Sequence, residues 1–208
     1  VFNSRVIDEA GNTQMEIFTA NISTGETYRL TDNPSFDDSG RWSPDGSEII
    51  FYSDRDGSMD LWKVSVNESG HPLEPAVKVL ESDAREHCGR WSFDGKYIVY
   101  ESDKTGVNHL WMMTSDGFNE TQLTFDNNQN GYPAWHPSGD YIVYNKQTST
   151  SSNLHILSLL DGETKRLTMH QMGVDAHPTW SADGKYIAFH SDRAGNFDIW
   201  IMEIPLTI

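Results

Sequence analysis

Arg41-Trp42-Ser43-Pro44-Asp45-Gly46 is a stretch whose pattern occurs four times in this chain of 208 residues. The other copies are Arg-Trp-Ser-Phe-Asp-Gly at 90–95, Ala-Trp-His-Pro-Ser-Gly at 134–139 and Thr-Trp-Ser-Ala-Asp-Gly at 179–184. Their tryptophans, Trp42, Trp91, Trp135 and Trp180, lie 49, 44 and 45 residues apart. A period near 45 residues predicts supersecondary units that are stacked or arranged around an axis.

The residues after each tryptophan repeat as well. An Asp-Gly or Ser-Gly pair comes first, and an apolar run such as Ile49-Ile50-Phe51 follows seven to nine residues after the tryptophan. Asp-Gly between two such segments is a strong hairpin signal, so we expect the two segments to be antiparallel neighbours, with positive φ at both turn residues. A third strand ends in Leu61-Trp62 or its counterparts, and a fourth is expected near 28–31, 77–80, 121–124 and 165–168. Four short strands per repeat are typical of a propeller blade.

The repeats predict one all-β domain over residues 1–208, a β-propeller of four-stranded antiparallel blades. About five blades are visible, at roughly 1–40, 41–84, 85–127, 128–170 and 171–208. The first lacks its innermost strand, and the tail 205–208 is too short for a clear outermost strand in the last. Because propellers close into rings, two interpretations stay open. Another element fills the gap, or the chain is a fragment of a larger propeller or protein.

Composition excludes several classes of function. Fifteen basic and 31 acidic residues give a net charge of −16, which disfavours nucleic acids and anionic membranes as partners. The single cysteine, Cys88, cannot form a disulfide within the chain, and no apolar run approaches the roughly 20 residues of a membrane span. The chain also lacks Gly-x-Ser-x-Gly, His-Glu-x-x-His, Cys-x-x-Cys and phosphate-loop motifs, which removes the commonest hydrolase and nucleotide-binding readings.

Trp-Ser-Pro-Asp-Gly, followed by Ile-Ile-Phe-x-Ser-Asp-Arg-Asp-Gly and Asp-Leu-Trp-Lys-Val, resembles the TolB-like β-propeller repeat. The resemblance covers nearly the whole chain. The third copy departs from it at His136, Ser138, Gln147 and His155. The family includes periplasmic partners of envelope proteins, propeller domains that gate peptidases, and polysaccharide lyases. The resemblance therefore implies a non-catalytic binding module for a protein or peptide partner in a periplasmic or extracellular setting. The alternative is the propeller domain of an enzyme, either a metal-dependent polysaccharide lyase or a serine peptidase.

One constellation of residues suggests a binding site. Four residues stand five positions before the repeat tryptophans, and four others lie beside them: Asp37, Glu86, Asn130 and Asp175, then Asp38, His87, Tyr132 and His177. We expect the loops that carry them to converge at one mouth of the central channel, because the tryptophan strand is innermost. Carboxylates suit a hard cation such as calcium, with Asp37, Glu86 and Asp175 as candidate ligands, and histidines suit manganese. Instead of a cation, these side chains could bind a basic group from a partner, or they could form a solvated rim without any ligand.

Three further expectations concern single residue types. Asp54, Asp103 and Asp192 should cap the turn between the second and third strands of their blades, because Asp side chains accept hydrogen bonds from nearby amides. The four repeat tryptophans should be buried between blades. Asn21, Asn67 and Asn119 head Asn-x-Ser/Thr sequences and are glycosylation candidates in surface loops.

Overall fold

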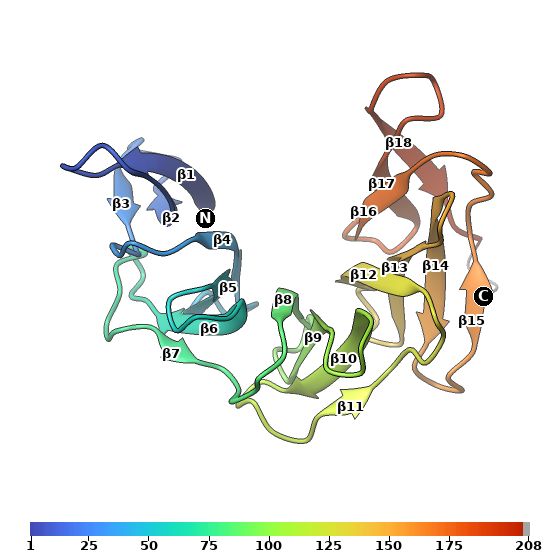
Figure 1. Cartoon of the computed structure of the whole chain (residues 1–208), viewed down its shortest axis with the longest axis horizontal. Coiled ribbons are helices and arrows are strands. Elements are labelled where there is room, and N and C mark those ends of the chain that lie inside the picture. Colours follow the sequence, from blue (N-terminus) through green and yellow to red (C-terminus); the bar gives the residue numbers. More distant parts are fainter. Residues whose placement is uncertain (206–208) are drawn as a thin grey trace.

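Five small antiparallel sheets follow one another along an arc in the computed structural model, which describes residues 1–205 (Figure 1). The first sheet is β1 (Phe2–Ile7), β2 (Thr13–Ala20) and β3 (Thr27–Arg29), and the second is β4 (Asp37–Trp42), β5 (Glu48–Ser53), β6 (Asp60–Ser65) and β7 (Val77–Lys78). The third is β8 (Glu86–Trp91), β9 (Tyr97–Ser102), β10 (His109–Thr114) and β11 (Thr121–Gln122). The fourth is β12 (Gln129–Trp135), β13 (Tyr141–Gln147), β14 (Ser152–Ser158) and β15 (Thr164–Arg166), and the fifth is β16 (Asp175–Trp180), β17 (Tyr186–Ser191) and β18 (Asp198–Glu203).

This architecture confirms the predicted all-β propeller of five blades. Within each sheet the strands pair in chain order, and β4, β8, β12 and β16 lie on the inner side of the arc (Figure 1). The first sheet has no strand inside β1, and residues beyond 205, where a last outer strand was considered, lie outside the described part. No helix occurs within residues 1–205, and no helix able to span a membrane is found there.

The repeated turn differs from the expected two-residue hairpin. Gly46 has φ 74°, but Asp45 is not among the positive-φ residues. The Gly46 amide donates to the Ser43 carbonyl at 3.0 Å, and the Ser43 hydroxyl accepts the Glu48 amide at 2.9 Å. Only the glycine needs the left-handed conformation, because the side chain of Ser43 completes a wider loop. The antiparallel pairing that the turn predicts is confirmed, with Trp42 opposite Ile49.

The hydrophobic core lies between neighbouring blades. Trp91 packs with Ile50 and Leu61 of the preceding blade, and Trp135 packs with Val99 and its neighbours in the same way. Trp91 and Trp135 are therefore buried, as expected, and Trp180 is half-buried. The expectation is wrong for Trp42, which is 37% exposed. The first sheet has no innermost strand to cover its indole.

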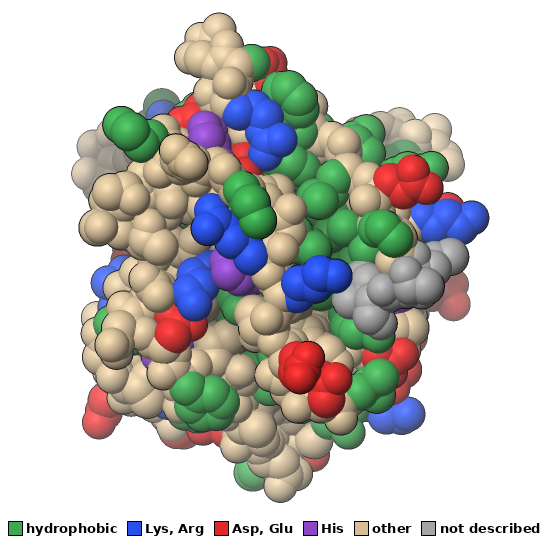
Figure 2. All heavy atoms as spheres, turned by 90° about the vertical axis from the view of Figure 1, so that its right-hand side faces the viewer, with side chains coloured by type: hydrophobic (Ala, Val, Ile, Leu, Met, Phe, Trp, Pro, Cys, Tyr) green, Lys and Arg blue, Asp and Glu red, His purple; other side chains and the backbone are tan. Residues whose placement is uncertain are grey.

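The side of the molecule that carries the last two blades combines two kinds of surface. Lys and Arg side chains gather beside histidines across its middle, and hydrophobic side chains gather at its upper right (Figure 2). His155 lies on β14, in the fourth blade. Burial, followed by the charges of Lys146 and Arg166, lowers the pKa of its imidazole to about 4, so the ring is neutral at pH 7. Ile199 and Ile201 of β18 are exposed. The overall negative charge of the chain is therefore unevenly distributed.

Candidate functional site

Each inner strand contains the same local distortion. The pairing register of β4, β8, β12 and β16 with the next strand shifts just before the repeat tryptophan, which marks a β-bulge. The residue three positions before each tryptophan has positive φ, at 57°, 54°, 52° and 53°: Ser39, Cys88, Tyr132 and His177. Such conformations cost non-glycine residues about 1–3 kcal/mol each and concentrate at functional sites, where bulges re-aim side chains. Four of them around one axis identify this end of the inner strands as the candidate site.

The eight predicted site residues do not form two equivalent rings. Tyr132 and His177 are bulge residues, whereas Asp38 and His87 precede the bulge by one position. Asp38 accepts a hydrogen bond from the hydroxyl of Tyr52 at 3.3 Å, and the His87 ring meets the edge of the same tyrosine. Asp38 and His87, which occupy the same repeat position in neighbouring blades, are therefore linked through Tyr52.

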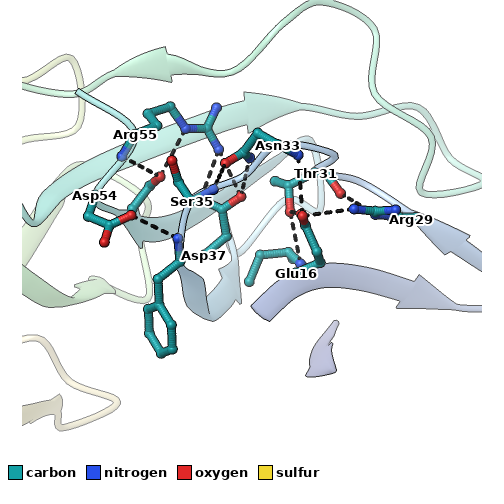
Figure 3. Close-up of polar contacts among 11 residues, drawn as sticks. Glu16, Arg29, Thr31, Asn33, Ser35, Asp37, Asp54 and Arg55 are labelled. Carbon is teal, nitrogen blue, oxygen red and sulfur yellow. Dashed lines mark hydrogen bonds and ion pairs between the residues drawn. The ribbon is translucent and has the colours of Figure 1, made fainter. Parts of the chain in front are cut away.

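Asp37, Glu86, Asn130 and Asp175 lie within the inner strands, so their predicted loop location is wrong. All four are fully buried, because the inner strands begin at or just before these residues and pair them with the second strand of each blade. Two of the carboxylates have a guanidinium partner from the same blade. Arg55 contacts Asp37 at 3.0 Å (Figure 3), and Arg193 contacts Asp175 at 2.8 Å.

Both arginines stand thirteen residues after their repeat tryptophan. Each also lies over an aromatic ring of its own blade, Arg55 over Trp62 at 4.7 Å and Arg193 over Trp200 at 5.0 Å. In the second blade Asn33 donates a further hydrogen bond to Asp37 at 2.6 Å (Figure 3). The carboxylates at these two repeat positions are thus neutralised inside their blades.

The third blade lacks this arrangement. Lys104 stands at the position of the arginine, but its ammonium group contacts Glu120 at 2.6 Å and lies over Trp111. Glu86 therefore has no cationic partner. Its Oε2 and the Oδ1 of Asp60, on the neighbouring blade, are both buried without a donor. Burial raises the pKa of Glu86 to about 7, and Asp60 acts in the same direction. A proton on Glu86 would let its carboxyl group donate to the Oδ1 of Asp60, whose other oxygen pairs with Lys78 at 3.0 Å.

The fourth blade avoids the charge altogether, because Asn130 takes the place of the carboxylate and Thr148 that of the arginine. The Asn130 amide lies 3.3 Å from Nδ1 of His109 on the preceding blade. Across the four complete inner strands, the carboxylates at this position that have a guanidinium partner, Asp37 and Asp175, pair with an arginine of their own blade, whereas the pKa of Glu86 is raised.

These contacts bear on the metal-ligand expectation. A cation bound by Asp37 or Asp175 would have to displace a guanidinium, and Glu86 holds its proton up to about pH 7. Cation binding by these residues stays a prediction. His87, Cys88 and Glu101 form a second group of possible metal ligands, because their ligand atoms lie within 4.8 Å of one another. Burial raises the pKa of the Cys88 thiol, so it is protonated at pH 7.

The axial space beyond the bulges is a cavity of about 350 Å³. Arg41, Arg90, Tyr132, His177 and Thr179 line it together with three repeat tryptophans. The Tyr132 and His177 rings lie 3.7 Å apart, and they also line a second cavity of about 380 Å³ with His190. Desolvation, then His190 and Arg90, lowers the pKa of His177 to about 4. The sequence analysis missed Arg41 and Arg90, although their place directly before a repeat tryptophan was a usable signal.

The repeated aspartates have a different role from the one expected. Asp54 accepts the amide of Phe36 at 2.8 Å, Asp103 that of Arg85 at 2.9 Å, and Asp192 that of Val174 at 2.9 Å. Each amide lies 18 residues earlier, immediately before an inner strand. The aspartates therefore tie the start of the inner strand to the second turn rather than capping that turn.

The glycosylation candidates are exposed in turns that follow β2, β6 and β10. The side-chain oxygen of Asn21 accepts the amide of Ser23, and that of Asn67 accepts the amide of Ser69, both at 2.9 Å. Asn119 has φ 55°. Their positions agree with the expected surface loops, and their modification stays a prediction.

Comparison with known proteins supports a TolB-like propeller, as the repeat predicted. Residues 127–206 match the family described as TolB beta propeller domain. A Tol-Pal system protein TolB of Francisella tularensis subsp. mediasiatica is 32% identical over 95 residues, which cover 43% of this chain and 21% of that protein. Dipeptidyl-peptidase 5 of Porphyromonas gingivalis is 34% identical over 73 residues, covering 31% and 11%. The chain thus matches about a fifth of the length of its TolB relatives.

Solved structures agree on the fold. TolB from Acinetobacter baumannii has a TM-score of 0.77 at 19% identity, covering 91% of this chain and 46% of that one. A protein described as a putative TolB from Agrobacterium tumefaciens has a TM-score of 0.74 at 23% identity, covering 90% and 65%. An oligogalacturonate lyase in complex with manganese has a TM-score of 0.65 at 14% identity, covering 90% and 56%.

Proposed function

We propose that this chain is a non-catalytic binding module that presents the axial end of its inner strands to a protein partner, as part of a Tol-Pal-type system in the periplasm. The observation that carries the proposal is the ring of four bulges at Ser39, Cys88, Tyr132 and His177. The bulge recurs in all four complete inner strands, and at Tyr132 and His177 it holds an aromatic side chain in the wall of the axial cavity. Such strain persists where the surrounding structure holds a side chain for recognition.

The composition of the axial end suits a protein partner. Tyrosine and arginine are enriched at the centres of protein interfaces, and Tyr132, Arg41 and Arg90 line the same cavity. The TolB relatives are described as Tol-Pal system proteins, which supports partners from that system. The same similarity supports the periplasmic setting.

Glycine substitutions at the bulges provide the test. Glycine accepts positive φ without strain, so His177→Gly and Tyr132→Gly remove a side chain while relieving the backbone. We expect each variant to bind the purified Tol and Pal proteins of its own organism at least tenfold more weakly in isothermal titration calorimetry. Asn119→Gly is the matched control, because Asn119 has the same φ but lies in an exposed outer turn. Unchanged affinities in both bulge variants, or no binding by the unaltered chain, would refute the proposal.

The enzyme alternative draws its support from the match to dipeptidyl-peptidase 5. A peptidase propeller would act beside a catalytic domain, and a lyase would cleave oligogalacturonate with manganese. Turnover of oligogalacturonate by the purified chain with added manganese, lost in His177→Gly and kept in Asn119→Gly, would favour the lyase over the binding module.

A further inference from the structure

Two arginines in the axial cavity have no acidic partner. Arg41 and Arg90 occupy equivalent positions in β4 and β8, directly before the repeat tryptophan. Each donates a hydrogen bond to the carbonyl of the preceding glycine, at 2.8 and 3.1 Å. Within residues 1–205 no carboxylate oxygen lies within 4.0 Å of either guanidinium, whereas Arg29, Arg55 and Arg193 each have one.

The two guanidinium groups act on each other. Burial and then the charge of Arg41 lower the pKa of Arg90 to about 10, so the Arg90 guanidinium remains cationic at pH 7. The carboxylate of Glu101 acts in the opposite direction and raises the pKa of Arg90. Glu101 is already engaged, because it accepts the Tyr132 amide at 2.7 Å and faces Nδ1 of His87 at 3.3 Å. Positive charge in the cavity is therefore not matched.

The remaining walls add no carboxylate. None of the acidic side chains within the described residues 1–205 lines this cavity. Its other walls include the aromatic side chains of Trp91, Trp135 and Trp180, and the indole of Trp135 already donates to the carbonyl of Arg90 at 3.0 Å. The two arginines are therefore the charged groups that line it.

We propose that this cavity binds a carboxylate group held between Arg41 and Arg90, supplied by an acidic side chain or chain end of the protein partner. The inference rests on the proposed function for the source of the carboxylate. Guanidinium groups bind carboxylates in a bidentate manner, and the bound charge relieves the repulsion between the two arginines. A cavity of about 350 Å³ admits one side chain or a small dicarboxylate. The net charge of −16 disfavours a polyanion.

The test uses succinate and a short peptide with capped ends and a single Glu side chain as probes. Each is titrated into the whole chain at pH 7 and constant ionic strength, with melting temperature and calorimetry as readouts. We expect a saturable rise in melting temperature with both probes, since a ligand that binds only the folded state stabilises it. The peptide should bind at least tenfold more tightly than succinate. The opposite order would indicate that the cavity binds a free small anion, and would refute a protein partner as the source of the carboxylate.

The variants Arg41→Gln and Arg90→Gln should each weaken binding of both probes at least tenfold. Arg85→Gln is the matched control, because it removes the same charge from an exposed side chain outside the cavity, and it should stay within twofold. Arg90→Gln should melt at or above the temperature of the unaltered chain without ligand, which shows that it folds. Equal stabilisation by the probes in all three variants, or none in the unaltered chain, would overturn the proposal.

Failure of this inference can be told apart from failure of the proposed function. If Tol or Pal proteins bind the chain, and Arg41→Gln and Arg90→Gln do not reduce their affinity, the carboxylate pocket is refuted and the binding module stands. If the acidic peptide binds through both arginines while neither protein binds, the pocket stands and the Tol-Pal assignment fails.

Discussion

Glu86→Gln should stabilise this protein in a pH-dependent way. Glu86 is fully buried, has no cationic partner, and faces Asp60 through an oxygen that lacks a donor. The variant replaces a carboxyl group by an amide of the same shape, which can donate to Asp60 at any pH as the protonated acid does. The substitution therefore removes only the ionisation of Glu86, and the packing at the blade junction is kept.

The magnitude follows from the pKa of Glu86, which is 4.5 in an ordinary environment and about 7 here. The folded state holds the proton more tightly than the unfolded chain, so stability is full below about pH 4.5 and falls as the pH rises to about 7. Each tenfold difference in proton affinity is worth about 1.4 kcal/mol, so the loss at pH 8 is roughly 3 kcal/mol. At pH 5 most of this loss has not yet occurred.

Thermal unfolding of the unaltered chain and the variant at pH 5 and pH 8 measures the effect. We expect Glu86→Gln to melt roughly 6–12 °C higher at pH 8, at about 2–4 °C per kcal/mol for a domain of this size, and at most about 3 °C higher at pH 5. Asp175→Asn is the matched control at the equivalent repeat position. Burial opposes ionisation of Asp175, but hydrogen bonds from Arg193, Ser191 and Thr168 outweigh it and lower its pKa.

The control should therefore respond with the opposite sign. The stability that Asp175 contributes is present above its ordinary pKa of 3.8. Asp175→Asn leaves Arg193 without its partner and should melt lower at both pH values. Should Glu86→Gln shift the melting temperature equally at pH 5 and pH 8, or lower it at pH 8, the assignment of a proton to Glu86 would be wrong.

Two further predictions follow from the packing and from the axial stack. Trp91→Ala should lower the free energy of unfolding by roughly 3–5 kcal/mol, and Trp42→Ala by less than half of that amount, because Trp42 is 37% exposed and Trp91 is 9% exposed. Urea titration measures the free energy of unfolding of both variants. Equal losses would contradict the exposed position of Trp42. His177 should stay neutral down to about pH 4, since desolvation, His190 and Arg90 lower its pKa. An NMR titration checks this, and a midpoint near 6.5 would show that His177 is not desolvated beside His190 and Arg90 in solution.

The sequence alone determined the blades. The repeat fixes which residues pair, because a tryptophan at a constant distance from a turn glycine and an apolar run imposes one strand register, as Trp42 opposite Ile49 shows. The positive φ of Gly46 was readable for the same reason: a local turn depends on a few neighbouring residues. The burial of Trp91 and Trp135 between blades also followed from the repeat.

Only the tertiary structure decided the site. The bulges at Ser39, Cys88, Tyr132 and His177 share a backbone conformation but no residue type, so no sequence pattern marks them. The fates of Asp37 and Glu86, one paired with Arg55 and the other protonated beside Asp60, depend on residues from other strands and other blades. Strand pairing is encoded by local periodicity, whereas the charge state of a buried group is set by whichever side chains the assembled blades bring within a few ångströms of it.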